Sequence, residues 1–260
     1  MLLHFAVSQI VSGGALLWLN NYADLGAESY YQYTIVLTGI TALLSLIPAL
    51  YFYRRDHFSR VYGGVLSQKA GNRLSAGEIV LLFLMGGGLS IYGNLLVNML
   101  GSFLEKKEYQ ELMNQVTEGK SLVMMIFWMG IVAPAAEEVI FRCLIYLRLR
   151  DYCRTVSAAA VISALIFGLY HGNLLQAVYA FLLGMLFAMI LEKTGSLVSC
   201  LLLHMGANTA SLITSEFASV PDLESVMPFL SGYLLLLMVS AVGGCWYFFG
   251  KRQKSGMRMV

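Results

Sequence analysis

The sequence predicts an all-α fold: a polytopic membrane protein built as a bundle of about eight transmembrane helices. The first reason is composition, because 58% of the 260 residues are hydrophobic and only 12% are charged, whereas a soluble domain carries about 25% charged residues. The mean hydropathy is accordingly high, +0.70. The other two reasons are a series of long apolar runs and an uneven distribution of Lys and Arg between them.

Each apolar run of about 17 to 25 residues is long enough to cross a bilayer as a helix. The eight predicted spans lie near residues 3–20, 31–53, 78–104, 121–147, 156–172, 174–191, 196–215 and 228–250. No long linker, low-complexity tract or repeat separates them. Residues 1–260 are therefore predicted to form a single integral membrane domain.

Several spans carry local signals of their own. The first lacks the positive region of a signal peptide, so it is predicted to be retained as a span. Ser75 and Glu78 form the pattern of a capping box where the third span begins, and the glycines at 86–88 within that span are expected to permit close helix packing. Pro228 suits the first turn of the eighth span.

The connections between the spans predict the orientation, because cytoplasmic loops hold the excess of Lys and Arg. Thirteen of the seventeen basic residues fall within 54–77, 148–155, 192–195 and the tail after 250. The alternate connections contain only Lys106, Lys107 and Lys120, and Arg142 lies inside a span. This distribution predicts a multi-pass protein of the cell membrane with both termini in the cytoplasm.

The net charge bears on the class of partner, and the cysteine spacing bears on whether disulfides are expected. A net charge of +2, with the basic residues in short clusters, does not predict binding to nucleic acid, so the lipid bilayer is the expected partner. The four cysteines form no CxxC pair and no disulfide framework. We expect Cys143, Cys153, Cys200 and Cys245 to be small hydrophobic residues.

The fourth span contains the stretch APAAEEVIFR, residues 133–142, with three ionisable side chains at bilayer depth. Such groups are costly in a membrane, so they usually face the bundle interior and have a partner or a function. Glu138 and Arg142 share one helix face and are expected to pair, which by itself could be simple neutralisation. Glu137 lies about 100° around the helix and has no charge partner there.

Two other spans supply imidazoles and an amide. FGLYHGN places Phe167 and His171 four residues apart, and HMGAN does the same for His204 and Asn208. A single intramembrane histidine is often only bonded to a carbonyl, but two of them with an unpaired carboxylate in one bundle indicate a functional site. His4 and His57, at a terminus and in a basic loop, are assigned no function.

These residue types restrict the chemistry. One Glu with two His is the ligand set of several zinc hydrolases, but the HExxH helix is absent, as are a GxSxG nucleophile motif and any Asp within a span. The remaining interpretation is a carboxylate that activates water, with imidazoles and an amide that stabilise the oxyanion of a tetrahedral intermediate. The cofactor stays open between a divalent metal such as zinc and none.

The same residues resemble a known family, the CAAX prenyl endopeptidases and bacteriocin-processing intramembrane proteases, often called CPBP or Abi. Its signatures EExxxR, FxxxH and HxxxN correspond to EEVIFR (137–142), FGLYH (167–171) and HMGAN (204–208), in that order. The segment LEKTGSL (191–197) is also similar to the family. The resemblance covers about residues 120–215, the predicted catalytic core, and leaves out the first three spans.

The resemblance implies an eight-span bundle with an active-site cavity inside the bilayer. It implies an endopeptidase that cleaves membrane-associated, lipidated or leader-type peptides or proteins. Glu137 would activate the water, and His171, His204 and Asn208 would bind that water or the oxyanion. Glu138 and Arg142 would orient the site or the substrate. A metalloprotease and a metal-free glutamate peptidase would use the same residues.

Two other functions fit these residues. A non-catalytic member of the same fold could act as a bacteriocin-immunity or peptide-binding membrane protein. A proton-coupled transporter would also use intramembrane Glu and His, but it should show an inverted repeat, and none is visible.

Overall fold

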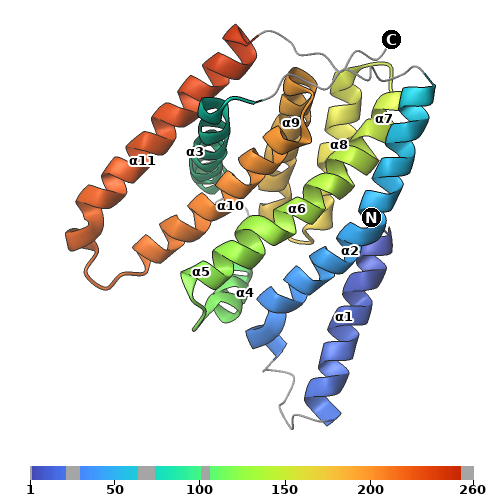
Figure 1. Cartoon of the computed structure of the whole chain (residues 1–260). Helices are drawn as coiled ribbons and strands as arrows, with labels where there is room; N and C mark the ends of the chain where they lie inside the picture. Colours follow the sequence, from blue (N-terminus) through green and yellow to red (C-terminus); the bar gives the residue numbers. More distant parts are fainter. Residues whose placement is uncertain (1, 22–29, 64–73, 101–105, 253–260) are drawn as a thin grey trace.

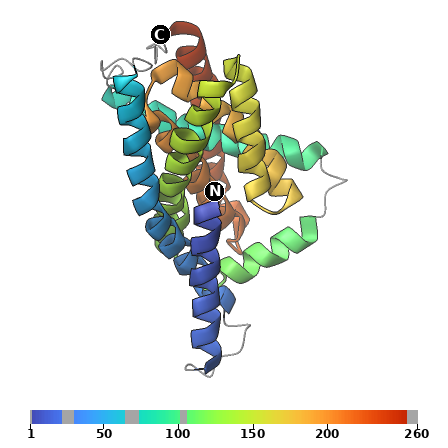
Figure 2. The ribbon, with the colours of Figure 1, turned by 90° about the vertical axis from the view of Figure 1, so that its right-hand side faces the viewer.

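The structure is a computed structural model that describes residues 2–21, 30–63, 74–100 and 106–252. Over these residues the regular elements are all helices, with no strand. Figures 1 and 2 show the helices packed side by side into one bundle, with α1 at its edge. The predicted all-α fold class is confirmed.

The first helices are α1 (Leu2–Asn21), α2 (Tyr30–Tyr62), α3 (Ala76–Leu100) and α4 (Lys106–Thr117). One long helix, Leu122–Tyr152, then includes α5 (Leu122–Met125), α6 (Ala133–Glu138) and α7 (Leu147–Tyr152). The wider turns between them, Ile126–Val132 and Val139–Tyr146, are π-helical. The last helices are α8 (Val156–Tyr170), α9 (Leu174–Thr194), α10 (Leu197–Ala218) and α11 (Leu223–Cys245), which continues as a π-helical turn to Lys251.

Six of the described helices are long and apolar enough to cross a membrane, which makes this a multi-pass membrane protein. They are α2, α3, Leu122–Tyr152, α9, α10 and Leu223–Lys251. The predicted first and fifth spans, α1 and α8, are helices outside this set, and α8 has only 15 residues. Its turn into α9 consequently lies well within the length of the bundle in Figure 1.

Helix α4 occupies a connection that the apolar runs left without structure. Its sequence, KKEYQELMNQVT, is too polar to register as a span. Val116 near its end is buried in a small cluster with Ile35 of α2 and Met125 of α5. This short helix therefore closes one end of the bundle through a few apolar contacts.

Two helices begin where a side chain caps the free backbone N–H groups of the first turn. The predicted capping box is present, since the backbone N–H of Ser75 donates to Glu78 at 2.8 Å and the N–H of Glu78 donates to the Ser75 hydroxyl at 3.3 Å. The prediction for Pro228 was wrong. Helix α11 begins five residues earlier because the side chain of Asp222 caps it, which leaves Pro228 inside the helix.

The glycines at 86–88 allow α3 to approach two helices at backbone distance, as predicted. A Cβ atom at Gly86 would lie 2.0 Å from the carbonyl oxygen of Leu203 in α10, and one at Gly88 would lie 2.1 Å from that of Leu237 in α11. Gly206 of α10 makes the reciprocal approach, since a Cβ atom there would lie 1.9 Å from the carbonyl oxygen of Phe83. Any side chain at these positions would separate the helices.

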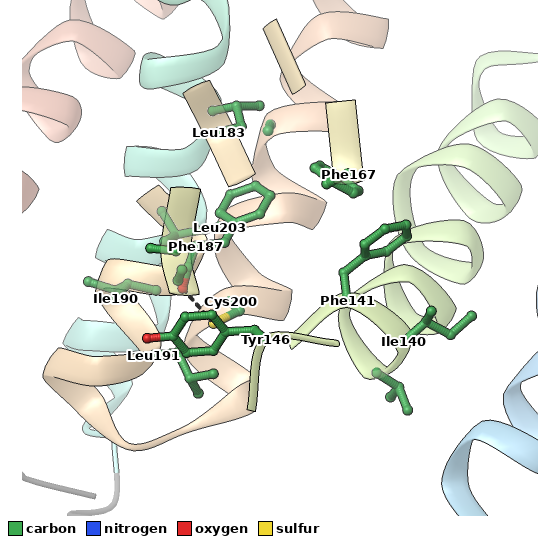
Figure 3. Close-up of a cluster of buried hydrophobic side chains, with 14 of the residues drawn as sticks. Ile140, Phe141, Tyr146, Phe167, Leu183, Phe187, Ile190, Leu191, Cys200 and Leu203 are labelled. Carbon is green, nitrogen blue, oxygen red and sulfur yellow. Dashed lines mark hydrogen bonds between the residues drawn. The ribbon is translucent and has the colours of Figure 1, made fainter. Parts of the chain in front are cut away.

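The main hydrophobic core lies between the long helix Leu122–Tyr152 and helices α8, α9 and α10. Figure 3 shows its aromatic centre, where Phe141, Phe167 and Phe187 converge from three helices. Phe141 and Phe167 meet edge to face, with ring centroids 4.8 Å apart. Cys200 is fully buried here and its thiol donates to the Phe187 carbonyl at 3.2 Å, so it is the buried residue that was expected.

Ion pairs tie the helices together at one end of the bundle, the end predicted to face the cytoplasm. Arg60 of α2 binds Asp151 of α7 through two nitrogens, with the shortest distance 2.7 Å. Arg252 binds the capping Glu78 at 2.6 Å. Glu192 of α9 accepts hydrogen bonds from Arg150 and Tyr146. Part of the basic excess that indicates orientation is therefore also structural.

Candidate active site

The long helix Leu122–Tyr152 carries both predicted carboxylates on its central turns. Pro134 has no N–H to donate, and the π-helical turn before it shifts the hydrogen-bond pattern so that the helix continues past it. Such wide turns often occur at functional sites because they re-aim the side chains that follow. Glu137 and Glu138 lie between two of them and point to different surroundings.

Glu138 is fully buried, and its carboxylate is hydrogen-bonded to two other predicted site residues. Its Oε2 accepts from Arg142 Nε at 2.9 Å, so the predicted pair is present. Its Oε1 lies 2.9 Å from His204 Nδ1. Because a carboxylate accepts, His204 donates here from Nδ1–H. Glu138 thereby fixes the imidazole of α10 to the long helix and leaves its Nε2 for another partner.

Arg142 is completely buried among aromatic rings. Its guanidinium carbon lies 5.1 Å from the Phe167 ring centroid and 5.4 Å from that of Phe187. The quadrupoles of the two rings favour a cation at their faces. The Phe187 ring also stacks on His204, with centroids 5.0 Å apart. The aromatic centre of the core therefore holds the Glu138–Arg142–His204 group rigidly.

Glu137 has a more open position. Its side chain keeps 17% of its surface exposed, and its Oε2 lies 3.6 Å from His204 Nε2. Among the described residues no Lys or Arg forms an ion pair with it. Its carboxylate is therefore next to the free nitrogen of His204 but is not neutralised by a fixed cation.

His171 and Asn208 lie near this group but without a contact to Glu137 among the described residues. The Nδ1 atom of His171 is 2.8 Å from the Phe167 carbonyl oxygen, and its ring meets the Phe167 ring edge to face at 4.9 Å. Asn208 donates from Nδ2 to the carbonyl of Met129 at 2.8 Å. The structure thus joins four of the six predicted residues directly and places these two around them.

A polar cavity of about 150 Å³ opens beside Glu137. Its lining includes Glu137 of α6, His4 of α1 and Tyr170 of α8, whereas His171, His204 and Asn208 are absent from it. His4, to which the sequence assigned no function, is therefore at the site. The spacing of His4, Ser8 and Ser12 along one helix face is the signal that could have indicated this.

A catalytic zinc site uses three protein ligands. Glu137 and the Nε2 atom of His204 form one pair of donors. Within the described residues, however, no three His, Cys, Asp or Glu side chains are grouped so that they could hold a metal ion. This arrangement does not fit a three-ligand metal site.

Comparison with known proteins agrees with the motifs. Residues 119–210 match the family model described as type II CAAX prenyl endopeptidase, Rce1-like. An Escherichia coli protein described as an uncharacterized 24.3 kDa protein is 30% identical over 134 residues, which are 47% of this chain and 62% of that protein. No solved structure matches the chain. The matched residues 119–210 contain all six predicted site residues, so this part of the chain is similar to the Rce1-like CAAX prenyl endopeptidases, as the motifs predicted.

Proposed function

We propose that the chain is an intramembrane endopeptidase in which Glu137 activates the attacking water. The observation that supports this best is the contrast between adjacent carboxylates. Glu138 is buried and bonded to Arg142 and His204, whereas Glu137 lines a polar cavity inside an apolar bundle. A carboxylate without a fixed cation in a space that admits water is suited to act as a general base.

The reaction requires only one proton carrier. Glu137 takes a proton from water while the water oxygen bonds to the substrate carbonyl carbon, and the carbonyl π electrons move onto its oxygen. When the oxyanion collapses, the C–N bond breaks and the leaving nitrogen takes the proton from Glu137. The carboxylate is then restored, and the products are a carboxylic acid and an amine.

His204 is proposed to orient the water between its Nε2 and Glu137. With Nδ1–H donated to Glu138, the neutral ring has its acceptor lone pair at Nε2, 3.6 Å from Glu137 Oε2. Glu138 and Arg142 act through this imidazole as positioning residues. His171 and Asn208 are proposed to bind the water or the oxyanion, as in the family resemblance.

The proposed substrates are membrane-associated peptides or proteins, of lipidated or leader type. The family match and the location of the site within membrane-spanning helices support this class. Incubation with peptide libraries would identify the preferred substrate and the bond that is cleaved.

Substitution of Glu137 tests the function. Glu137→Gln removes the base but keeps the shape, so kcat should fall by about 10²–10⁴-fold. Purified protein in nanodiscs would be incubated with membrane-anchored reporter peptides, prenylated and unmodified, and the products identified by mass spectrometry. Glu216→Gln, an exposed carboxylate of α10, is the matched control and should keep wild-type activity.

Two results would contradict the proposal. Cleavage at the wild-type rate by Glu137→Gln would show that another group activates the water. Peptide binding without cleavage by the wild-type protein would instead favour the non-catalytic immunity or peptide-binding function.

A further inference from the structure

Polar groups from three helices meet beside the cavity that Glu137 lines, and two of them, His4 and Tyr170, belong to its lining. His4 Nδ1 lies 2.8 Å from the hydroxyl of Ser45 in α2, and His4 Nε2 is hydrogen-bonded to the hydroxyl of Tyr170 in α8. These partners are 41 and 166 residues away from His4 in the sequence. Helix packing alone, rather than a local motif, brings them together.

One of the two neutral tautomers of His4 leaves a donor for the cavity. A neutral imidazole donates from one nitrogen and accepts at the other. If the Ser45 hydroxyl donates to Nδ1, then Nε2–H donates to the Tyr170 oxygen. The single hydroxyl proton of Tyr170 is then not used by His4 and can be donated to a molecule in the cavity, whose lining includes Tyr170.

A donor in this place would add to the stabilisation proposed for the motif residues. His171, His204 and Asn208 are not part of the cavity lining, and among the described residues no Lys or Arg belongs to it. Peptide hydrolysis develops negative charge on the carbonyl oxygen, and a preorganised neutral hydroxyl can stabilise that charge. Two tyrosines, Tyr30 of α2 and Tyr170 of α8, line the same cavity as Glu137, and Tyr170 is the one whose hydroxyl is hydrogen-bonded to His4.

We propose that Tyr170 is a further catalytic residue that donates its hydroxyl proton in a hydrogen bond to the substrate carbonyl oxygen. His4 is a positioning residue that binds the phenol oxygen through Nε2–H, and Ser45 holds the imidazole in that tautomer. No proton is transferred in this interaction. The inference rests on the proposed function, and it makes α1 part of the site although α1 lies outside residues 119–210.

The α1 helix presents more than one polar group to this space. His4, Ser8 and Ser12 are spaced by four residues and all line the cavity, opposite Thr38 and Thr41 of α2. Hydroxyl groups on both walls can bond the polar backbone of an extended peptide without adding charge. Figure 2 shows α1 along the outside of the bundle, so one wall of the cavity is a peripheral helix.

Kinetics of substituted proteins test the pair. Tyr170→Phe should lower kcat by about 10²–10³-fold, the usual effect of removing an oxyanion donor, with KM within about twofold. His4→Ala should lower kcat by about 10- to 100-fold, the usual effect of losing a group that orients a functional residue. His4→Gln keeps an N–H donor and should recover part of that loss. Tyr92→Phe is the control. It also removes a tyrosine hydroxyl, but that hydroxyl donates to the carbonyl of Leu234, and neither residue lines the cavity.

A double substitution separates positioning from a merely structural role. If His4 acts through the phenol, His4→Ala should cause no further loss of kcat in the Tyr170→Phe background. Equal losses in both backgrounds would overturn the positioning role. Where Tyr170→Phe unfolds at a lower temperature than Tyr92→Phe, the comparison of His4→Gln with His4→Ala decides instead, and equal activity of these two overturns the inference.

Failure of this inference can be told apart from failure of the proposed function. Wild-type kcat in Tyr170→Phe, together with an inactive Glu137→Gln, would overturn only the role of Tyr170. A wild-type protein that cleaves no reporter, or a fully active Glu137→Gln, would overturn both.

Discussion

At the scale of residues, neighbouring carboxylates have opposite roles because the helix directs them to different surroundings. Glu138 lies completely in the core, where Arg142 and His204 satisfy both of its oxygens. Glu137, one residue earlier, keeps 17% of its side chain exposed at the cavity. Arg142 and His204 stabilise Glu138 as a fixed anion in a network, whereas Glu137 is proposed to exchange a proton with water in the cavity.

The buried pair predicts a specific pattern of stability. Arg142→Met leaves Glu138 as an uncompensated buried charge, so the free energy of unfolding should fall by about 3–5 kcal/mol. Adding Glu138→Gln removes that charge while keeping an acceptor for His204 Nδ1–H, and should recover part of the loss. Thermal unfolding in detergent measures both, and a double variant less stable than Arg142→Met alone would contradict the pairing.

At the scale of elements, close helix contacts depend on residues without side chains. The glycines of α3 and α10 allow backbone-to-backbone approach, and in a membrane such packing replaces the hydrophobic effect as the force between helices. Helix α10, which carries His204, packs both on α3 and directly on the long helix. Packing at the glycines and geometry at the site are therefore linked.

A methyl group at Gly206 tests this contact. In Gly206→Ala the new Cβ would lie 1.9 Å from the Phe83 carbonyl oxygen, so α3 and α10 must separate. We expect a loss of about 1–3 kcal/mol in stability, as for other overpacked cores. Gly243→Ala has nothing within 4 Å of its Cβ and should be neutral or more stable by up to about 1 kcal/mol. Equal unfolding temperatures of the two would contradict the proposed contact.

At the scale of the whole molecule, polar interactions are divided between the end of the bundle and its centre. The end carries ion pairs between α2, α7, α9, α3 and the C-terminal turn, where they fasten helices to one another. The centre carries the site and its cavity.

The ion pairs at the end of the bundle should contribute more to the free energy of unfolding the more deeply they are buried. Arg60 is 8% exposed and binds Asp151 through two nitrogens, so Arg60→Met should cost about 1.5–3 kcal/mol. Arg148 is 46% exposed, and Arg148→Met should cost less than about 1 kcal/mol. Unfolding at low and high salt would check this, because only the exposed pair should weaken markedly with salt. The reverse ranking would contradict the structural role of Arg60.

Patterns within one helix could be predicted from the sequence because their partners are three or four residues apart. The capping box at Ser75 and the Glu138–Arg142 pair are of this kind, and both are present. Pro228 was misplaced because a competing cap, Asp222, lies outside the apolar run. Helix α4 was missed because hydropathy detects spans and not short polar helices.

The sequence by itself determined the fold class, six of the eight predicted spans and the motif residues, since apolar length and helical spacing are local properties. Only the tertiary structure decided which polar groups share the cavity. His4 and Tyr170 are 166 residues apart, so no local pattern relates them, and the packing of α1 beside α2 and α8 brings them to Glu137. The contact of His171 with the Phe167 carbonyl, four residues earlier, is by contrast local to the end of α8.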